Sequence, residues 1–235
     1  MKILCVFEHN GNDTLLYAAN LPGAFTRGEN PAIATEKMQR EAASYLRWKH
    51  APLPSSFDID IIQEQASSLQ IRDADSDVIF AEEAAPLTLE EYTALKALAL
   101  KSANDFLALF NAIPHKHATC LPSRPTFYGQ APRTAAEMYA HTKSVNSYYF
   151  AEIGVEADND GTILACRERG FAKLEQQPDF LQNPVLVGSY GEQWSVRKVL
   201  RRFIWHDRIH AKAMYRMAKQ TFGADAVPNI FHFDA

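Results

Sequence analysis

Residues 194–210 read WSVRKVLRRFIWHDRIH, and this stretch decides the fold of the second half of the chain. Ser195 is a suitable N-cap for a helix, and Gly223 is a suitable stop after Phe222. At about 100° per residue, both histidines fall on one apolar stripe of this helix. The stripe consists of Val196, Val199, Phe203, His206, His210, Met214 and Met217. We therefore predict that both histidines point into the core of a helical bundle.

The opposite side of the same helix carries a run of basic residues. Its members are Arg197, Lys198, Arg201, Arg208, Lys212, Arg216 and Lys219. A charged face opposite an apolar stripe is the ordinary pattern of an amphipathic helix. We interpret this side as a solvated face, and a surface for an anionic ligand or a nucleic acid is the alternative.

Three further helices are predicted upstream. Thr88 with Glu91 and Thr134 with Glu137 form two capping boxes, which open helices that run toward Ile113 and Phe150. Residues 114–132 form a long irregular connection between them, and another helix is expected near 162–176. The helical projection places His141 on the inward stripe of the second of these helices.

Three inward histidines suggest a metal site. His206 and His210 lie four residues apart, so they present two imidazoles on one side of the helix. His141, from a neighbouring helix, would complete a facial set of three nitrogen ligands with positions left open for water or substrate. A bound ion would lower the pKa of a water or a thiol beside it to near neutrality. Hydrogen bonding within a core, without metal, is the competing explanation.

The surrounding residues resemble the DinB-like metalloprotein superfamily. RTAAEMYAH at 133–141 is similar to its second-helix pattern, and WSVRKVL at 194–200 followed by HDRIH at 206–210 is similar to its last helix. The resemblance spans residues 87–223 and implies an up-and-down four-helix bundle. It also implies that His141, His206 and His210 bind zinc, nickel or a similar divalent ion. Members include thiol-dependent transferases and hydrolases, so the resemblance leaves the reaction open.

Two carboxylates are candidates for orienting the imidazoles or for catalysis. Glu137 neighbours His141 and Asp207 borders the His206 face, but Glu137 also serves a capping box and Asp207 could pair with a surface base such as Arg208 or Arg202. Residues 206–210 also imitate the H-E-x-x-H motif of zinc peptidases, with a shorter aspartate in place of the general base. We rank that interpretation below the DinB-like one.

The first 82 residues predict a small α/β module. Residues 3–7 and 14–19 form a hairpin around the turn at 10–13, residues 31–48 form an amphipathic helix, and residues 57–62 and 76–81 are candidate strands. The LPGAF segment at 21–25, followed by Gly28 and the helix, is similar to the HicB-like ββ(β)α module over about the first fifty residues. HicB-like modules are antitoxin domains that bind a toxin, but the DNA-binding segment that usually accompanies them is not evident.

These parts define an α+β protein with a module at 1–82, a metal-binding bundle at 87–223 and a tail at 224–235. The net charge of -4 gives no reason to expect a nucleic-acid or membrane partner. Three separated cysteines and the lack of a long apolar run favour a cytoplasmic location. A homodimer fits such bundles, although no sequence feature fixes its interface.

The leading functional hypothesis is a metal-dependent hydrolase or thiol S-transferase. Its three-histidine site would activate water or a low-molecular-weight thiol for reaction with a small-molecule substrate. The alternative is a metal-stabilised or metal-sensing protein that binds a partner without catalysis. A site open to exchangeable ligands favours the enzyme, whereas a closed coordination shell favours the binding protein.

Overall fold

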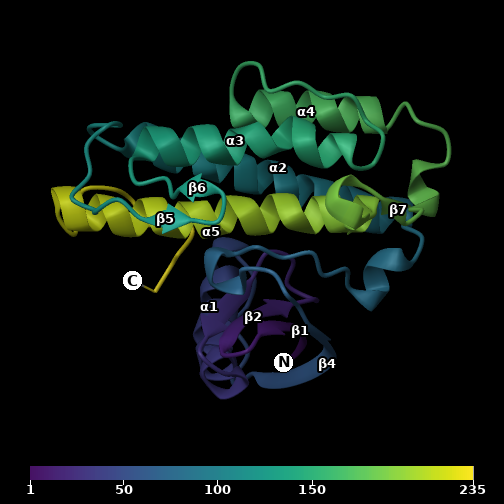
Figure 1. Cartoon of the computed structure of the whole chain (residues 1–235), viewed down its shortest axis with the longest axis horizontal. Coiled ribbons are helices and arrows are strands. Elements are labelled where there is room, and N and C mark those ends of the chain that lie inside the picture. The colour runs from purple at the N-terminus through teal and green to yellow at the C-terminus, as the bar shows by residue number, and fades with distance from the viewer. Residues whose placement is uncertain (235) are drawn as a thin grey trace.

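The computed structural model describes residues 1–234 and confirms an α+β protein with a small N-terminal sheet and a helical second half (Figure 1). The sheet has the strand order β3-β2-β1-β4, in which β1 pairs antiparallel with β2 and parallel with β4. Its elements are β1 (Lys2–Asn10), β2 (Asp13–Ala18), β3 (Phe25–Gly28), α1 (Pro31–Trp48) and β4 (Asp58–Ala66).

The helix α1 covers one face of this sheet. Its N-cap Asn30 accepts a hydrogen bond from the backbone N–H of Ile33, and Pro31 occupies the first turn, where a missing N–H costs nothing. Met38 and Ala42 are fully buried in the cluster that also holds Cys5 from β1. The hairpin, the helix and the strand near residue 58 are therefore confirmed.

The predicted strand at 76–81 is wrong. This segment is extended and ends in the 3₁₀ turn η2 (Ala81–Ala84), but it pairs with no strand among the described residues. Side chains, mostly from the last helix, bind the carbonyl oxygens that a partner strand would have used. The acceptors are Ser76, Asp77, Val78 and Ile79, and the donors are Arg202, Lys198, Arg201 and Gln63.

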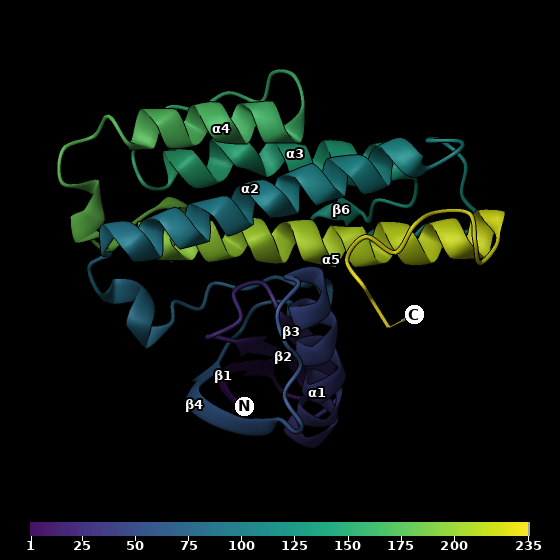
Figure 2. The same ribbon diagram turned by 180° about the vertical axis from the view of Figure 1, so that it is seen from behind.

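The second half contains α2 (Leu89–Ala112), α3 (Ala135–Ala151), α4 (Ile163–Leu174) and α5 (Val196–Phe222). Both predicted capping boxes are present, and Ser195 caps α5 as expected. These helices pack against one another (Figure 2). Short irregular elements connect them: η1 (Ile71–Asp73), β5 (Pro125–Thr126), β6 (Gly129–Gln130), η3 (Phe180–Gln182), β7 (Leu186–Val187), η4 (Ser189–Gly191) and β8 (Gln193–Trp194). Within residues 1–234, no helix is long and apolar enough to cross a membrane.

The helix directions differ from an up-and-down bundle, in which each helix reverses the previous one. The backbone N–H of Ile163, at the start of α4, donates to the hydroxyl of Tyr139 near the start of α3. Near their other ends, the rings of Phe150 and Phe171 meet at a centroid distance of 5.3 Å. These contacts mean that α3 and α4 run the same way. The connection over 152–162 is long enough to return along the bundle, since an extended chain gains about 3.3 Å per residue and a helix about 1.5 Å.

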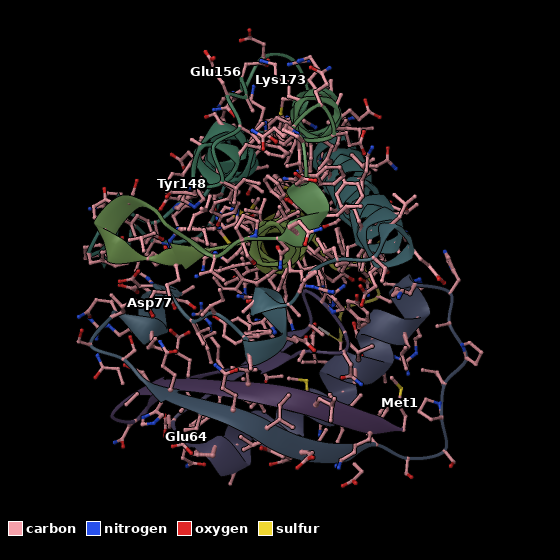
Figure 3. The ribbon with its side chains drawn as sticks, turned by 90° about the vertical axis from the view of Figure 1, so that its right-hand side faces the viewer. Met1, Glu64, Asp77, Tyr148, Glu156 and Lys173 are labelled. Carbon is pink, nitrogen blue, oxygen red and sulfur yellow. The ribbon has the colours of Figure 1, made fainter. Side chains whose placement is uncertain are left out.

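The helix α5 lies between the other helices and the sheet (Figure 3). The sheet face opposite α1 packs against it through Trp205, whose ring lies 5.8 Å from Tyr17 and 6.1 Å from Phe25. Val78 and Phe80, from the extended segment before α2, complete this second apolar cluster. The main cluster likewise holds residues of the sheet, α1 and all the later helices, so the two halves share one core.

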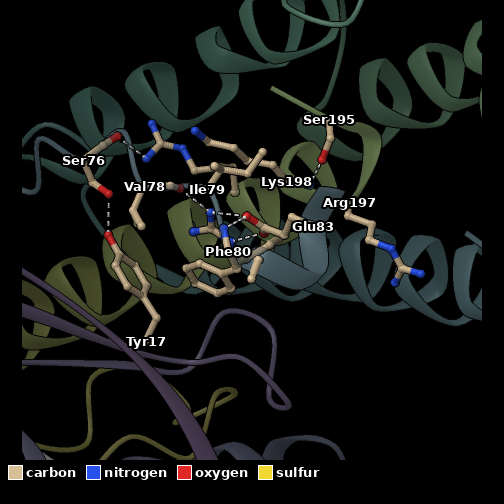
Figure 4. Close-up of polar contacts among 12 residues, drawn as sticks. Tyr17, Ser76, Val78, Ile79, Phe80, Glu83, Ser195, Arg197 and Lys198 are labelled. Atoms are coloured by element: carbon tan, nitrogen blue, oxygen red, sulfur yellow. Dashed lines mark hydrogen bonds and ion pairs between the residues drawn. The ribbon is translucent and has the colours of Figure 1, made fainter. Parts of the chain in front are cut away.

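This arrangement corrects the interpretation of the basic side of α5 as solvated. Lys198, Arg201 and Arg208 are buried, because the N-terminal half of the chain covers them. Arg201 binds Glu83 through both its Nε and Nη2 (Figure 4). Lys198 donates to the carbonyl oxygen of Asp77 and pairs with Glu192. Only the distal end of the run keeps an exposed member, Arg216.

A buried ion pair joins α5 to α1. Arg208 Nη2 lies 2.7 Å from Glu41 Oε1, and both side chains are almost wholly buried. Lys212 reaches the other oxygen of Glu41 at 3.0 Å from a partly exposed position. The tail at 224–234 closes this region, since Phe231 stacks on Trp48 with ring centroids 5.4 Å apart. Charge pairing and aromatic packing thus hold the two halves together.

Replacement of Arg208 by Met should lower the free energy of unfolding by about 3–5 kcal/mol, because Glu41 would lose its buried partner. Lys212→Met is the matched control, since its partly exposed ion pair should contribute about 1 kcal/mol or less. Urea denaturation followed by circular dichroism measures both. Equal effects of the two substitutions would contradict the assignment of Arg208–Glu41 as the main charged contact between the two halves.

Candidate metal centre

The three predicted histidines meet between α3 and α5. His206 and His210 lie one turn apart on α5, with ring centroids 4.5 Å apart. The ring of His141, from α3, lies 5.2 Å from that of His206 and 4.6 Å from that of His210. Each residue offers a ring nitrogen, and these three nitrogens lie within 4.8 Å of one another. The antiparallel packing of α3 on α5 therefore brings together the set that the sequence singled out.

Burial keeps these imidazoles neutral. His206 is buried, and the loss of solvent, together with the closeness of His210 and His141, holds its pKa well below the ordinary value. Burial also lowers the pKa of His210, to about 3, and lowers that of His141. A neutral imidazole has a lone pair free for a metal, so the cluster offers three ligands at neutral pH.

The nitrogen Nδ1 of His206 supports a metal as the missing partner. It is buried and has no hydrogen-bond partner among the described residues. Unpaired buried polar atoms are rare and costly in native proteins. Two imidazole nitrogens on one tetrahedral ion lie about 3.4 Å apart, for bonds of about 2.0–2.1 Å. The three ring nitrogens of this cluster lie within 4.8 Å of one another, and their type and closeness fit a divalent transition metal.

A cavity of about 640 Å³ opens beside the histidines. Its size falls within the range of small-molecule sites, which is about 300–1,000 Å³. One wall is α5, another is the segment 73–77 from the N-terminal half, and a third is the loop before α3. Aromatic side chains line much of it: Phe127, Tyr128, Tyr148, Tyr149, Tyr190 and Trp205. The histidines thus lie at the wall of a space that admits a small molecule.

The two candidate carboxylates are engaged elsewhere. Glu137 accepts hydrogen bonds from the backbone N–H groups of Arg133 and Thr134, so it belongs to the capping box. Asp207 pairs with Arg167 of α4, with 3.1 Å between Nη2 and Oδ1, and both side chains are fully buried. Neither carboxylate lines the cavity. The structure therefore places Glu137 in the capping box and pairs Asp207 with Arg167 in place of the surface bases considered from the sequence.

Some other residues that could take part in chemistry line the cavity, and some do not. His115, His117 and Cys120 do not line it. Trp205, Tyr148 and Tyr149 pack against the apolar core and also form part of the cavity wall. Tyr149 contacts His206 edge-on at a centroid distance of 6.1 Å.

Sequence reasoning missed the cavity residues outside the bundle stripe. Arg27 lies in β3, Asp73 ends η1, and Asp75 and Asp77 come from the segment that follows η1. Arg202 lies on α5, where the sequence suggested only a surface base. One sequence signal could have predicted the burial of this side of the helix: Leu200, Ile204 and Ile209 lie near the basic positions, and apolar residues all round a helix indicate burial on every side.

Comparisons with protein-family models, with curated proteins and with solved structures gave no match for this chain.

Asp207→Asn should destabilise the fold without changing metal content. The substitution leaves the buried Arg167 without its counter-charge, which costs about 3 kcal/mol or more. Because Asp207 points away from the histidines, metal bound per folded chain should equal that of the unaltered protein. Glu168→Gln, at an exposed position of α4, is the control for both readouts. Loss of metal with unchanged stability would place Asp207 at the site after all.

Proposed function

We propose that this chain is a DinB-like metalloprotein whose His141, His206 and His210 hold one divalent transition metal, zinc or nickel in the first instance. The observation that carries the proposal is the convergence of three neutral imidazoles, one buried and two partly buried, at the wall of a small-molecule cavity. Imidazole donors suit zinc, nickel, copper and iron alike, so the ligands alone do not select the ion.

We further propose an enzyme that uses this site for hydrolysis or for thiol transfer on a small molecule. A divalent ion held there would supply Lewis acidity and lower the pKa of a water or thiol that reaches it. The chain itself supplies the ligands and the enclosure. The aromatic rings of Tyr148, Tyr149 and Trp205 limit solvent and offer an apolar surface to a substrate.

The cavity also bears on the alternative of a metal-stabilised partner-binding protein. A structural metal is usually enclosed by protein ligands on all sides, whereas a catalytic one keeps open positions. His141, His206 and His210 approach from two helices only, and the cavity lies beside them. This openness favours the enzyme.

The N-terminal module is proposed to be HicB-like in fold, on the support of three strands followed by a helix over the first fifty residues. An antitoxin-like role has little support. One face of its sheet is covered by α1 and the other by Trp205 and the segment before α2. In this chain the module supplies Arg27 to the cavity wall.

The course of α4 departs from the up-and-down order that the DinB-like resemblance implied. The proposal therefore depends on the three histidines and their helices rather than on the helix order. α3 and α5 carry all three ligands and run antiparallel, since Tyr149 packs on Phe203 while His141 packs on His210. The direction of α4 leaves that juxtaposition unchanged.

Plasma mass spectrometry on tag-free protein purified without added metal tests this proposal. We expect close to one equivalent of a transition metal per chain. The variant His141→Ala/His206→Ala/His210→Ala should lose it, because no other group of His, Cys, Asp or Glu ligands clusters comparably within residues 1–234.

His115→Ala/His117→Ala is the matched control, since these histidines lie outside the cavity and should leave the metal in place. Circular dichroism must show that the triple variant is folded. Absence of metal from the unaltered protein, even after reconstitution with zinc or nickel, would overturn the proposal.

A further inference from the structure

Arg202 differs from the other buried arginines of α5 and its neighbours. Arg167, Arg201 and Arg208 each form an ion pair with a buried carboxylate, namely Asp207, Glu83 and Glu41. Arg202 is only 8% exposed, yet it forms no ion pair within the described part of the chain. A buried guanidinium without a counter-charge is costly, so this exception calls for a partner.

The guanidinium of Arg202 is held firmly but is only partly satisfied. Its Nη1 donates to the carbonyl oxygen of Ser76 at 2.8 Å, whereas its buried Nε has no acceptor among residues 1–234. Three aromatic rings surround the group, at 5.0 Å for Trp205, 5.4 Å for Tyr149 and 5.5 Å for Trp194. These contacts fix the position of the guanidinium and leave donor capacity for a ligand.

The position of Arg202 relates it to the metal centre. It lines the same cavity as the three histidines. It precedes His206 by four residues on α5, and side chains at this spacing lie on one helix face about 6 Å apart. Arg202, His206 and His210 thus form a row along the cavity wall. A ligand held at Arg202 would extend toward the histidines within the length of a small molecule.

The nearby acids are already engaged. Glu192 pairs with Lys198 at 2.9 Å, and Glu8 accepts a hydrogen bond from Ser76 at 2.6 Å. The three aspartates of the opposite wall are engaged as well. Asp73 binds Arg124, Asp75 accepts from the backbone N–H of Gln70, and Asp77 accepts from Gln65. None of these carboxylates forms an ion pair with Arg202, so an anionic ligand in the cavity would supply the direct partner that Arg202 lacks.

We propose that Arg202 receives the carboxylate or phosphate of a small anionic substrate, whose remaining part lies along α5 toward His206 and His210. A planar guanidinium binds both oxyanions with paired N–H donors. The aromatic walls suit a substrate with an apolar or aromatic body. This inference builds on the proposed metal site, because it assigns the substrate class for that centre, but its oxyanion contact is separate from the histidines.

Isothermal titration calorimetry with benzoate, phenyl phosphate and the neutral benzamide tests the assignment on the full chain, with metal content measured on the same sample. At least one anion should bind about tenfold or more tightly than benzamide, as expected for hydrogen bonds to a charged group. The preferred anion identifies the oxyanion. The preference should persist in the triple histidine variant, which excludes direct ligation of an ion by the probe.

Arg202→Met should abolish the anion preference while leaving metal content unchanged. Arg202→Lys keeps the positive charge but lacks the paired N–H donors of the guanidinium, so it should lose most of the anion preference. This variant replaces Arg202→Met in the test if the Met variant fails to fold. Arg197→Met is the control, because Arg197 lies on α5 outside this cavity. Equal binding of anions and benzamide, or a preference that survives in Arg202→Met, would overturn the inference.

The two proposals fail in different ways. Bound metal without an anion preference would contradict the oxyanion site alone. An anion preference in a chain that takes up no metal would support Arg202 and contradict the metal centre.

Discussion

The first half of α5 is enclosed by protein on every side, and the rest of the structure depends on this constraint. Each residue from Lys198 to Arg208 is buried, although several are basic. Apolar neighbours alone cannot accommodate those charges, because a buried ion without a partner costs several kcal/mol. The N-terminal half supplies acceptors for these groups, namely Glu41 from α1, Glu83 from η2 and the carbonyl oxygens of the segment 76–78, although Arg202 receives no carboxylate among them.

The same enclosure creates the candidate site. On one side of α5, charge pairing fixes the helix against the sheet and α1. On another side, His206 and His210 face His141 across the gap to α3, and Arg202 continues their row. The helix α5 carries both residues that form structural ion pairs and residues that line the cavity. The first set holds the position of α5, and the second set faces the cavity. The N-terminal module therefore contributes to the site through the placement of α5 as well as through Arg27.

Local signals in the sequence predicted much of this structure. The capping boxes at Thr88 and Thr134 and the Ser195 cap depend on short-range hydrogen bonds, which residue types three apart reveal. The histidine stripe followed from helical periodicity. The direction of α4 and the burial of the basic side of α5 did not follow, because both depend on contacts between residues far apart in the chain. Arg202 is an example of a feature that the sequence did not predict. An arginine on a helix indicates a solvent-exposed position, and only the folded structure shows that Arg202 is buried without an ion-pair partner among the described residues.

We propose that three histidines bind one metal ion at an open site, and X-ray absorption spectroscopy at the edge of the bound metal tests this most directly. For zinc we expect a shell of nitrogen and oxygen ligands at about 2.0–2.1 Å, with the outer-shell scattering of three imidazoles and at least one further light ligand. A sulfur shell at about 2.3 Å from the protein's own cysteines, or a spectrum without imidazole scattering, would contradict it.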